Sequence, residues 1–417
     1  MTSNGGGALR ELLIDQVGAQ GDGLAAGPIY APLTLPGERV LAQVSGERAE
    51  VSEILQASAD RVAAPCPQFG ECGGCALQHW APAPYLAWKS EQIRLSLGRE
   101  RIETEILAPF AAAPGSRRRL ALHARRDGGR VRLGFKARRS WRLVDIETCP
   151  VSAPGLVAAF PALRQLAGAF FEHSKSAPTL HVTLTQTGLD VDVTGVERRS
   201  GGLSADGLGR AAQAALKADM ARVTLAGDMI YQSRQPTIQV GPATVALPAG
   251  AFLQAVAEAE AAMAQFAVEA VVGAGRVADL FCGVGAFSFR LARQAQVYAA
   301  DSSAPAIKAL AAACASAPGL KTITAEARDL ARRPLLAMEM KKLDAVVFDP
   351  PRAGALEQAG EIARSKVARV VGVSCNPTTF ARDARVLIDA GFTLERVKPI
   401  DQFLWSPHVE LVGVFGR

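Results

Sequence analysis

Short apolar runs alternate with glycine and proline in the N-terminal part of the chain. Between residues 11 and 57 the stretches G-A-Q-G-D-G-L-A and L-P-G-E-R-V-L-A-Q-V stand out, and V-S-E-I-L closes the segment. Short strands separated by frequent turns are typical of a small β-barrel of the OB type, a common oligonucleotide-binding fold. We therefore predict a barrel domain over residues 1–60.

The pattern over residues 61–250 predicts an α+β domain with an antiparallel sheet. Apolar residues at helical spacing over residues 85–97 predict a helix. Over residues 117–142 the apolar residues lie two apart, which predicts a hairpin that turns at the D-G-G stretch after Arg126. The stretch T-L-H-V-T-L-T-Q-T-G-L-D-V-D-V-T predicts a second pair of strands that turns near Gly188.

From about residue 262 the pattern changes again. The apolar stretches R-V-A-D-L-F, A-Q-V-Y-A-A-D, L-D-A-V-V-F-D and V-A-R-V-V-G-V-S recur, and a helical or turn segment follows each. Strands that alternate with helices form a mostly parallel, doubly wound sheet. The predicted fold class is therefore α/β, with a Rossmann-like domain over residues 251–417 behind the central α+β domain and the N-terminal barrel.

The charged residues of the predicted hairpin suggest a binding role. The chain of 417 residues is 49% hydrophobic, as folded chains are, and its net charge is +6, which permits an anionic partner. Residues 117–142 contain eleven Lys or Arg and one acid, Asp127. We interpret the polar side of the hairpin as a cationic face that follows nucleic-acid phosphates. The alternative is a face that is merely solvated.

No targeting or membrane segment is visible in the sequence. The first residues, M-T-S-N-G-G-G-A-L-R, lack a basic segment followed by an apolar run. Three prolines interrupt the longest charge-free stretch, residues 235–257. We therefore expect a cytoplasmic protein without a membrane span, and a monomer. In that compartment the seven cysteines need explanations other than disulfides.

The stretch A-D-L-F-C-G-V-G-A-F-S combines a strand, a glycine turn and the start of a helix. Gly283 and Gly285 permit a tight turn and let a ligand approach the backbone. Asp301 ends the next strand, where an acid can bind ribose hydroxyls. The loop has neither the G-x-G-x-x-G form of NAD sites nor the G-K-[ST] form of P-loops. These features favour an adenosine-type ligand without a pyrophosphate, such as S-adenosylmethionine.

Polar side chains also follow the later strands. Asp349 ends the strand of D-A-V-V-F-D-P-P-R, and Cys375 ends the strand of V-V-G-V-S-C-N-P. Because ligands of open α/β sheets bind at the carboxyl ends of the strands, four residues are expected to converge there: Asp279, Asp301, Asp349 and Cys375. The alternatives are a turn that happens to hold an acid and a packing thiol, although Cys282 and Cys314 fit a packing role better.

A cysteine and a carboxylate beside such a cofactor suggest one chemistry. Glu410 opens or lies within a strand, S-P-H-V-E-L-V-G-V-F, that a glutamate would otherwise avoid. Carbon 5 of uracil is a poor nucleophile until a thiolate adds at carbon 6, and a base must later remove the carbon-5 proton. We interpret Cys375 as the nucleophile and Glu410 as the base. Asp349 and Arg352 are candidates to orient the ring.

Four stretches in order, D-L-F-C-G-V-G, F-D-P-P-R, S-C-N-P-T-T-F-A-R-D and H-V-E, resemble the motifs of the RNA uracil-5 methyltransferases that carry a TRAM barrel, the RumA-like group. The resemblance covers nearly the whole chain. It implies the same roles for Cys375 and Glu410. It also implies a set of residues that bind S-adenosylmethionine: Gln254, Phe281, Gly283, Gly285, Asp301 and Asp349. The chain departs from the family pattern at Ala286, where a polar residue is usual, and at Asp301, which replaces a glutamate.

Four cysteines form a second constellation. Cys66, Cys72 and Cys75 are closely spaced, and Cys149 follows the basic hairpin. Such thiols can hold zinc or an iron–sulfur cluster, and their spacing leaves both open beside the alternative of scattered core thiols. C-G-G-C-x-L-Q-H resembles the 4Fe–4S loop of the family and thereby implies that cluster. The resemblance further implies an RNA substrate, 23S ribosomal RNA, with transfer RNA as the alternative.

Two other functions are consistent with parts of the sequence. Methyltransferases that act on exocyclic amines also use a D-P-P loop, but an aromatic residue normally follows it where this chain has Arg352, and they need no cysteine. A non-catalytic RNA-binding assembly factor could share the fold. The presence of both Cys375 and Glu410 argues against that reading.

Overall fold

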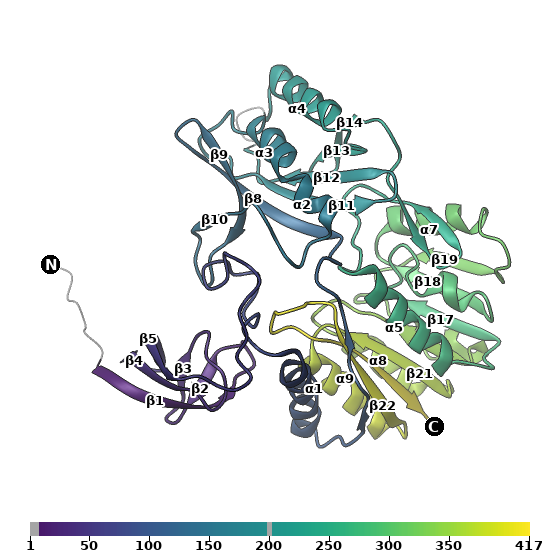
Figure 1. The fold of residues 1–417 in the computed structure, drawn as a ribbon. Helices are drawn as coiled ribbons and strands as arrows, with labels where there is room; N and C mark the ends of the chain where they lie inside the picture. Colours follow the sequence, from purple (N-terminus) through teal and green to yellow (C-terminus); the bar gives the residue numbers. More distant parts are fainter. Residues whose placement is uncertain (1–7, 198–201) are drawn as a thin grey trace.

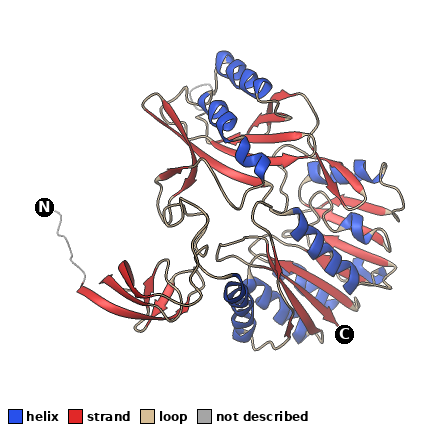
Figure 2. Ribbon diagram, viewed as in Figure 1, coloured by secondary structure: helices blue, strands red, loops and turns tan. Residues whose placement is uncertain are grey.

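The computed structural model describes residues 8–197 and 202–417, which form a small barrel, a central sheet and a C-terminal α/β sheet (Figure 1; Figure 2). Residues 1–7, on which the expectation of no targeting signal depends, lie outside this part. No helix in the described ranges is both long and apolar enough to cross a membrane.

The N-terminal barrel is closed, with the strand order β1-β2-β3-β5-β4. Its strands are β1 (Ala8–Val17), β2 (Gly23–Ala25), β3 (Ile29–Ala31), β4 (Arg39–Ser45) and β5 (Arg48–Gln56). Alternation along β1 buries Leu12 and Ile14 in the barrel while Leu13 stays exposed. A closed five-stranded barrel agrees with the predicted OB-type domain.

The central sheet has seven strands in the order β10-β9-β8-β11-β12-β13-β14. They are β8 (Arg119–Asp127), β9 (Arg130–Lys136), β10 (Leu143–Asp145), β11 (Thr179–Thr185), β12 (Gly188–Thr194), β13 (Arg222–Leu225) and β14 (Asp228–Gln232). Three helices belong to this layer: α2 (Pro154–Ala158), α3 (Phe160–Gly168) and α4 (Ala205–Lys217). Asp127 pairs with Arg130 across the first hairpin, so the predicted turn is confirmed.

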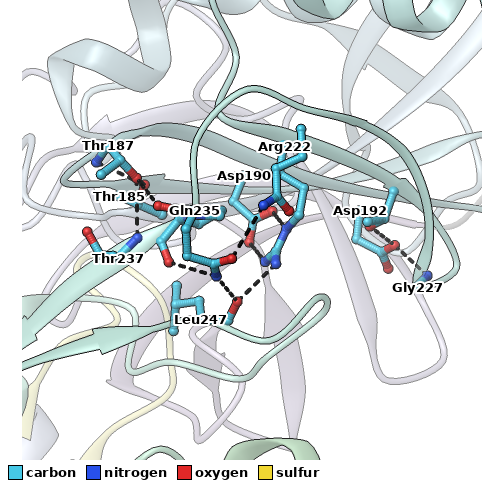
Figure 3. A network of polar contacts seen from close by, with 12 residues as sticks. Thr185, Thr187, Asp190, Asp192, Arg222, Gly227, Gln235, Thr237 and Leu247 are labelled. Atoms are coloured by element: carbon cyan, nitrogen blue, oxygen red, sulfur yellow. Dashed lines mark hydrogen bonds and ion pairs between the residues drawn. The ribbon is translucent and has the colours of Figure 1, made fainter. Parts of the chain in front are cut away.

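A buried ion pair ties the central sheet to the chain that leaves it (Figure 3). The guanidinium of Arg222 on β13 donates to both carboxylate oxygens of Asp190 on β12, at 2.8 and 2.6 Å. It also donates to the backbone oxygen of Leu247 at 2.9 Å. Because removing one partner of a buried pair typically costs about 3–5 kcal/mol, these contacts fix the segment that leads into the C-terminal sheet.

The C-terminal sheet has nine strands in the order β19-β18-β17-β20-β21-β23-β22-β6, with β7 also paired to β22. The strands are β6 (Glu105–Ile106), β7 (Phe110–Ala111), β17 (Arg276–Leu280), β18 (Gln296–Asp301), β19 (Ile323–Ala327), β20 (Ala345–Phe348), β21 (Arg369–Ser374), β22 (Thr393–Asp401) and β23 (Glu410–Gly416). The helices of this part are α5 (Ala257–Ala270), α6 (Ser288–Leu291), α7 (Ala304–Cys314), α8 (Leu356–Arg364) and α9 (Pro377–Asp389), with a 3₁₀ turn at Glu339–Lys342. Strands β17 to β21 are parallel, which confirms the predicted doubly wound sheet.

Two segments from the first half of the molecule join this C-terminal sheet. Helix α1 (Pro82–Arg99) packs against α9 and β22, and β6 and β7 run parallel to β22. A further hairpin, β15 (Thr237–Val240) with β16 (Ala243–Ala246), packs against α7. The sequence pattern placed these strands in the middle domain. Two-residue strands such as β6 and β7 carry no periodicity that would reveal their distant partner.

Part of the predicted cationic face of the hairpin is engaged within the protein. Arg138 and Arg139 each contact the carboxylate of Asp22 at 2.6 Å, and Arg48 contacts it at 3.3 Å. Asp22 lies in the barrel and is buried, so three arginines surround one acid where the barrel meets the hairpin. These two hairpin arginines therefore hold the barrel, which leaves fewer cations to contact phosphates than the sequence pattern suggested.

Candidate functional site

A cavity of about 930 Å³ opens at the carboxyl edge of the C-terminal sheet. Eight of the predicted site residues line it together: Gln254, Phe281, Gly283, Asp301, Asp349, Arg352, Cys375 and Glu410. They come from segments up to 156 residues apart, counted from position 254 to position 410. The residues that the sequence grouped as a cofactor site and a reactive pair thus line a single cavity.

The glycine loop after β17 forms one wall of the cavity. Phe281 and Gly283 have positive φ angles of 62° and 54°, in the left-handed region that allows the chain to turn directly after the strand. The backbone N–H of Gly283 donates to the Asp301 carboxylate at 3.0 Å. This bond joins the ends of β17 and β18 and fixes the acid at the lip of the cavity.

Two of the residues expected at this edge do not line the cavity. Gly285 faces the helix side, where an added Cβ would lie 2.6 Å from the ring of Phe289. Asp279 is fully buried, accepts a hydrogen bond from Ser288 at 2.5 Å, and burial raises its pKa to about 7. Gly285 permits close packing of the loop on α6, and the hydrogen bond between Asp279 and Ser288 stabilises the loop.

Cys375 and Glu410 meet because neighbouring strands run in opposite directions. Cys375 directly follows β21, whereas Glu410 is the first residue of β23, which lies antiparallel to β21. Ser374 therefore pairs with Leu411, and the end of one strand adjoins the start of the other. The expectation that Glu410 opens a strand is confirmed, and both side chains line the same cavity.

The S-C-N-P stretch also holds the D-P-P-R loop. Asn376 caps α9, since its side-chain oxygen accepts a hydrogen bond from the Thr378 N–H at 3.1 Å. Its side-chain amide donates to the backbone oxygen of Arg352 at 3.3 Å, and the Thr379 hydroxyl donates to the same oxygen at 3.3 Å. The two motifs are therefore one unit that sets Cys375 beside Asp349.

A chain of two glutamines links the cofactor side of the cavity to Glu410. Gln254 donates from Nε2 to the Asp349 carboxylate at 2.9 Å. Gln402 donates from Nε2 to Oε1 of Gln254 at 2.7 Å and to Oε2 of Glu410 at 2.5 Å. The side-chain oxygen of Gln402 accepts the Ala255 N–H at 3.1 Å, which fixes the direction of the amide. Sequence reasoning missed Gln402, because nothing in I-D-Q-F marks it as part of a site.

Burial shapes the ionisation of the reactive groups. It raises the pKa of Glu410 from 4.5 to about 8, assisted by the negative charge of Asp349 and opposed by the Gln402 hydrogen bond. Burial also raises the pKa of Asp349 to about 7. For Cys375, burial and the charges of Glu410 and Asp349 raise the pKa to about 11, while Arg352 lowers it. A proton-accepting carboxylate thus lies in a cavity where its pKa suits work near neutral pH.

The four cysteines of the second constellation line another cavity, of about 360 Å³. Cys66, Cys72, Cys75 and Cys149 are all free thiols. Burial raises the pKa of Cys75 to about 12. Arg117 lines this cavity and the larger one, so a positive charge lies between the thiols and the larger cavity. The thiols are brought together as the sequence predicted, from a loop and from the end of the basic hairpin.

The loop that carries three of these thiols is paired to the central sheet. The Gly73 N–H donates to the Lys136 oxygen at 2.9 Å, and Cys72 forms a β-bridge with Ala137. A Cβ on Gly73 would lie 2.9 Å from that same oxygen, so glycine is needed for the approach. Across the described ranges no three His, Cys, Asp or Glu side chains converge on a point that would hold a single metal ion.

Comparisons with known proteins place the chain in a family. Residues 216–416 match the family model described as tRNA (Uracil-5-)-methyltransferase. An RNA methyltransferase of Caulobacter vibrioides, named as uncharacterized, is 66% identical over 98% of this chain and 100% of its own length. The 23S rRNA (uracil(1939)-C(5))-methyltransferase RlmD of Halomonas elongata is 33% identical over 98% of this chain and 89% of its own.

The fold is also found in a solved structure. The tRNA (uracil-54, C5)-methyltransferase of Pyrococcus abyssi, solved with S-adenosyl-L-homocysteine, superposes with a TM-score of 0.72 over 97% of this chain and 99% of its own, at 23% identity. This likeness shows a shared fold over nearly the full length. Together with the relatives of higher identity, it means that the chain belongs to the tRNA (uracil-5-)-methyltransferase family of RNA methyltransferases.

Proposed function

We propose that this RNA methyltransferase transfers a methyl group from S-adenosylmethionine to carbon 5 of a uridine through a covalent adduct with Cys375. The observation that carries the proposal is the single cavity that holds a thiol, a carboxylate of raised pKa and the residues expected to bind the cofactor. A packing cysteine would have no reason to share a cavity with Glu410.

Cys375 and Glu410 act in different steps of the proposed reaction. Cys375 loses its proton to solvent and adds as thiolate to carbon 6, and the electron pair of the 5,6 double bond passes to carbon 5 as an enolate. Carbon 5 attacks the methyl group, and the sulfonium becomes a neutral thioether. Glu410 then takes the carbon-5 proton, the double bond re-forms, and the bond from carbon 6 to sulfur breaks to return the thiolate.

The cofactor would lie between the glycine loop and the glutamine chain. Asp301 is placed to accept hydrogen bonds from ribose hydroxyls, and Phe281 and Gly283 offer a close backbone surface. Gln254 and Asp349 would lie toward the methionine part. In this proposal Gly285 contributes by allowing the loop to pack, not by contact.

We further propose that the four-thiol cavity holds a 4Fe–4S cluster with a structural role. All four thiols line one cavity, and a 4Fe–4S cluster takes four cysteine thiolates as ligands. The resemblance of C-G-G-C-x-L-Q-H to the 4Fe–4S loop of the family favours the cluster over zinc. The half-buried guanidinium of Arg117 would offset the negative charge of four thiolates. Bound there, the group would cross-link the cysteine loop to the basic hairpin, and no step of methyl transfer requires it.

Protein purified without oxygen is expected to show broad visible absorbance and about four irons per chain. Because all four thiols line the cavity, Cys75→Ser should lower the iron content and the absorbance. Cys314→Ser is the matched control, since Cys314 ends α7 and lies outside that cavity. Iron analysis and absorption spectra measure the result. Stoichiometric zinc without iron in the wild type would show that the site is a zinc site.

The proposed target is a uridine of 23S ribosomal RNA. The relative from Halomonas elongata named for that RNA aligns over 98% of this chain. In a strain that lacks the gene, one 5-methyluridine should disappear from 23S RNA, and purified protein should restore it in RNA from that strain. Mapping of modified uridines measures this. Loss of the mark from transfer RNA instead would favour the alternative substrate. A cytoplasmic location and a monomeric state remain predictions.

A further inference from the structure

Residues 402–409 form a loop that joins β22 to β23 and carries the partners of the base. Gln402 is the first residue of the loop, and its side chain donates a hydrogen bond to Glu410, the first residue after the loop. The geometry of Glu410 therefore depends on how this loop is held. Several of its contacts come from α1, a helix more than 300 residues earlier in the chain: Trp405 and Tyr85 are 320 residues apart.

Lys89 of α1 ties both ends of the loop together. Its side chain is fully buried, and Nζ donates to Oδ1 of Asp401 at 2.6 Å and to the backbone oxygen of Phe403 at 3.3 Å. Nζ also donates to the backbone oxygen of His408. The three hydrogens of the ammonium group are thus matched by three acceptors. One acceptor precedes the loop and two lie near its opposite ends.

Tyr85, one helical turn earlier, holds the middle of the loop. Its hydroxyl donates to Oδ2 of Asp401 at 2.6 Å and accepts the Trp405 N–H at 2.8 Å. Trp405 has a φ of 59°, which is rare for a bulky residue and persists only where neighbours enforce it. The N–H groups of Ala76 and Leu77 donate to the Trp405 oxygen at 2.8 and 3.0 Å. The loop is therefore shaped from outside the strands that it connects.

We propose that Lys89 and Tyr85 are positioning residues for proton removal, because they hold the loop that orients Gln402 and Glu410. The inference rests on the proposed role of Glu410 as base. Neither residue lines the catalytic cavity, so both act through the loop. A buried lysine is costly unless fully paired, and apolar residues in place of a whole buried ion pair often keep a protein as stable. All of its polar partners belong to the segment that carries the base, which indicates a specific role.

The test separates proton removal from the steps before it. RNA that contains 5-fluorouridine reports addition and methyl transfer. Its carbon 5 carries fluorine in place of the hydrogen that the base must remove, so the methylated adduct persists. Tritium release from RNA labelled at carbon 5 of uridine reports proton removal. The variants are Tyr85→Phe, which keeps the ion pair, and the double variant Lys89→Met with Asp401→Asn, which removes both charges. Tyr298→Phe is the matched control, because it deletes a hydroxyl that bonds to Glu326 on the far strands.

In both variants the rate of adduct formation with 5-fluorouridine RNA should stay within about twofold of wild type, while tritium release falls about 10-fold to 100-fold, the range for a displaced catalytic group. A methylated adduct should then accumulate on ordinary uridine RNA. Tyr298→Phe should change neither rate. Wild-type tritium release by both variants, or an equal fall of both rates, would overturn the positioning role. Failure of the wild type itself to form a covalent complex would instead refute the proposed function.

Discussion

Replacing Cys375 with alanine is expected to lower methyl transfer to uridine by at least about 10⁴-fold, the scale seen when a covalent nucleophile is removed. Without the sulfur no enolate forms, and carbon 5 cannot attack the methyl group. The variant should also form no covalent complex with RNA that contains 5-fluorouridine. Transfer of labelled methyl groups and denaturing gels measure the two effects.

The matched control is Cys314→Ala. Cys314 is half-buried at the end of α7 and does not line the catalytic cavity, so its loss should leave methyl transfer and adduct formation unchanged. Cofactor binding by the Cys375 variant should persist, because the glycine loop and the glutamine chain are intact. Product formation by Cys375→Ala at a rate near that of the wild type would refute the covalent route.

Replacing Glu410 with glutamine is expected to slow turnover by about 10²-fold to 10⁴-fold, the usual contribution of a general base. Addition and methyl transfer precede the step that needs Glu410, so a methylated adduct should accumulate on ordinary uridine RNA. Denaturing gels and mass spectrometry detect it. Glutamine preserves the size of the side chain, and its oxygen can still accept from Gln402. Free turnover without adduct would remove Glu410 from the role of base.

The same variant carries a pH signature. A base works only when deprotonated, and burial raises the pKa of Glu410 to about 8, so wild-type kcat, which includes proton removal, should rise with pH through that region. The pKa of Cys375 is raised further, to about 11, so its thiolate fraction rises with pH across the whole range, and the rate of adduct formation should rise with it in both proteins. In Glu410→Gln the limb near pH 8 should be absent. Profiles of both proteins between pH 6 and pH 9 make the comparison.

The sequence predicted the catalytic edge because strand ends carry their own signals. Asp349 and Cys375 each follow an apolar strand, and parallel strands bring their carboxyl ends to one edge whatever the details of packing. Glu410 could be anticipated because a buried glutamate in an apolar strand contradicts its ordinary preference. For these residues local pattern and global topology agree.

The supporting residues could not be predicted in the same way. Gln402 and Lys89 act through contacts across 148 and 312 residues respectively, and no local pattern marks such pairs. The arginines that surround Asp22 looked like a surface for phosphates, since a sequence shows charge but not the partner that neutralises it. Polar contacts between residues far apart in the sequence therefore cannot be predicted from local patterns.

The placement of β6 and β7 beside β22 has a consequence for how the protein is made. Thr104 bonds to the Leu394 oxygen across 290 residues, so the segment before the central sheet cannot find its neighbours until β22 has been synthesised. The barrel and the central sheet can form before α1 packs against α9 and β22. Such non-local closure slows folding and prolongs the exposure of unpaired strands. The protein therefore completes its native fold late, when an early and a late part of the chain finally pair.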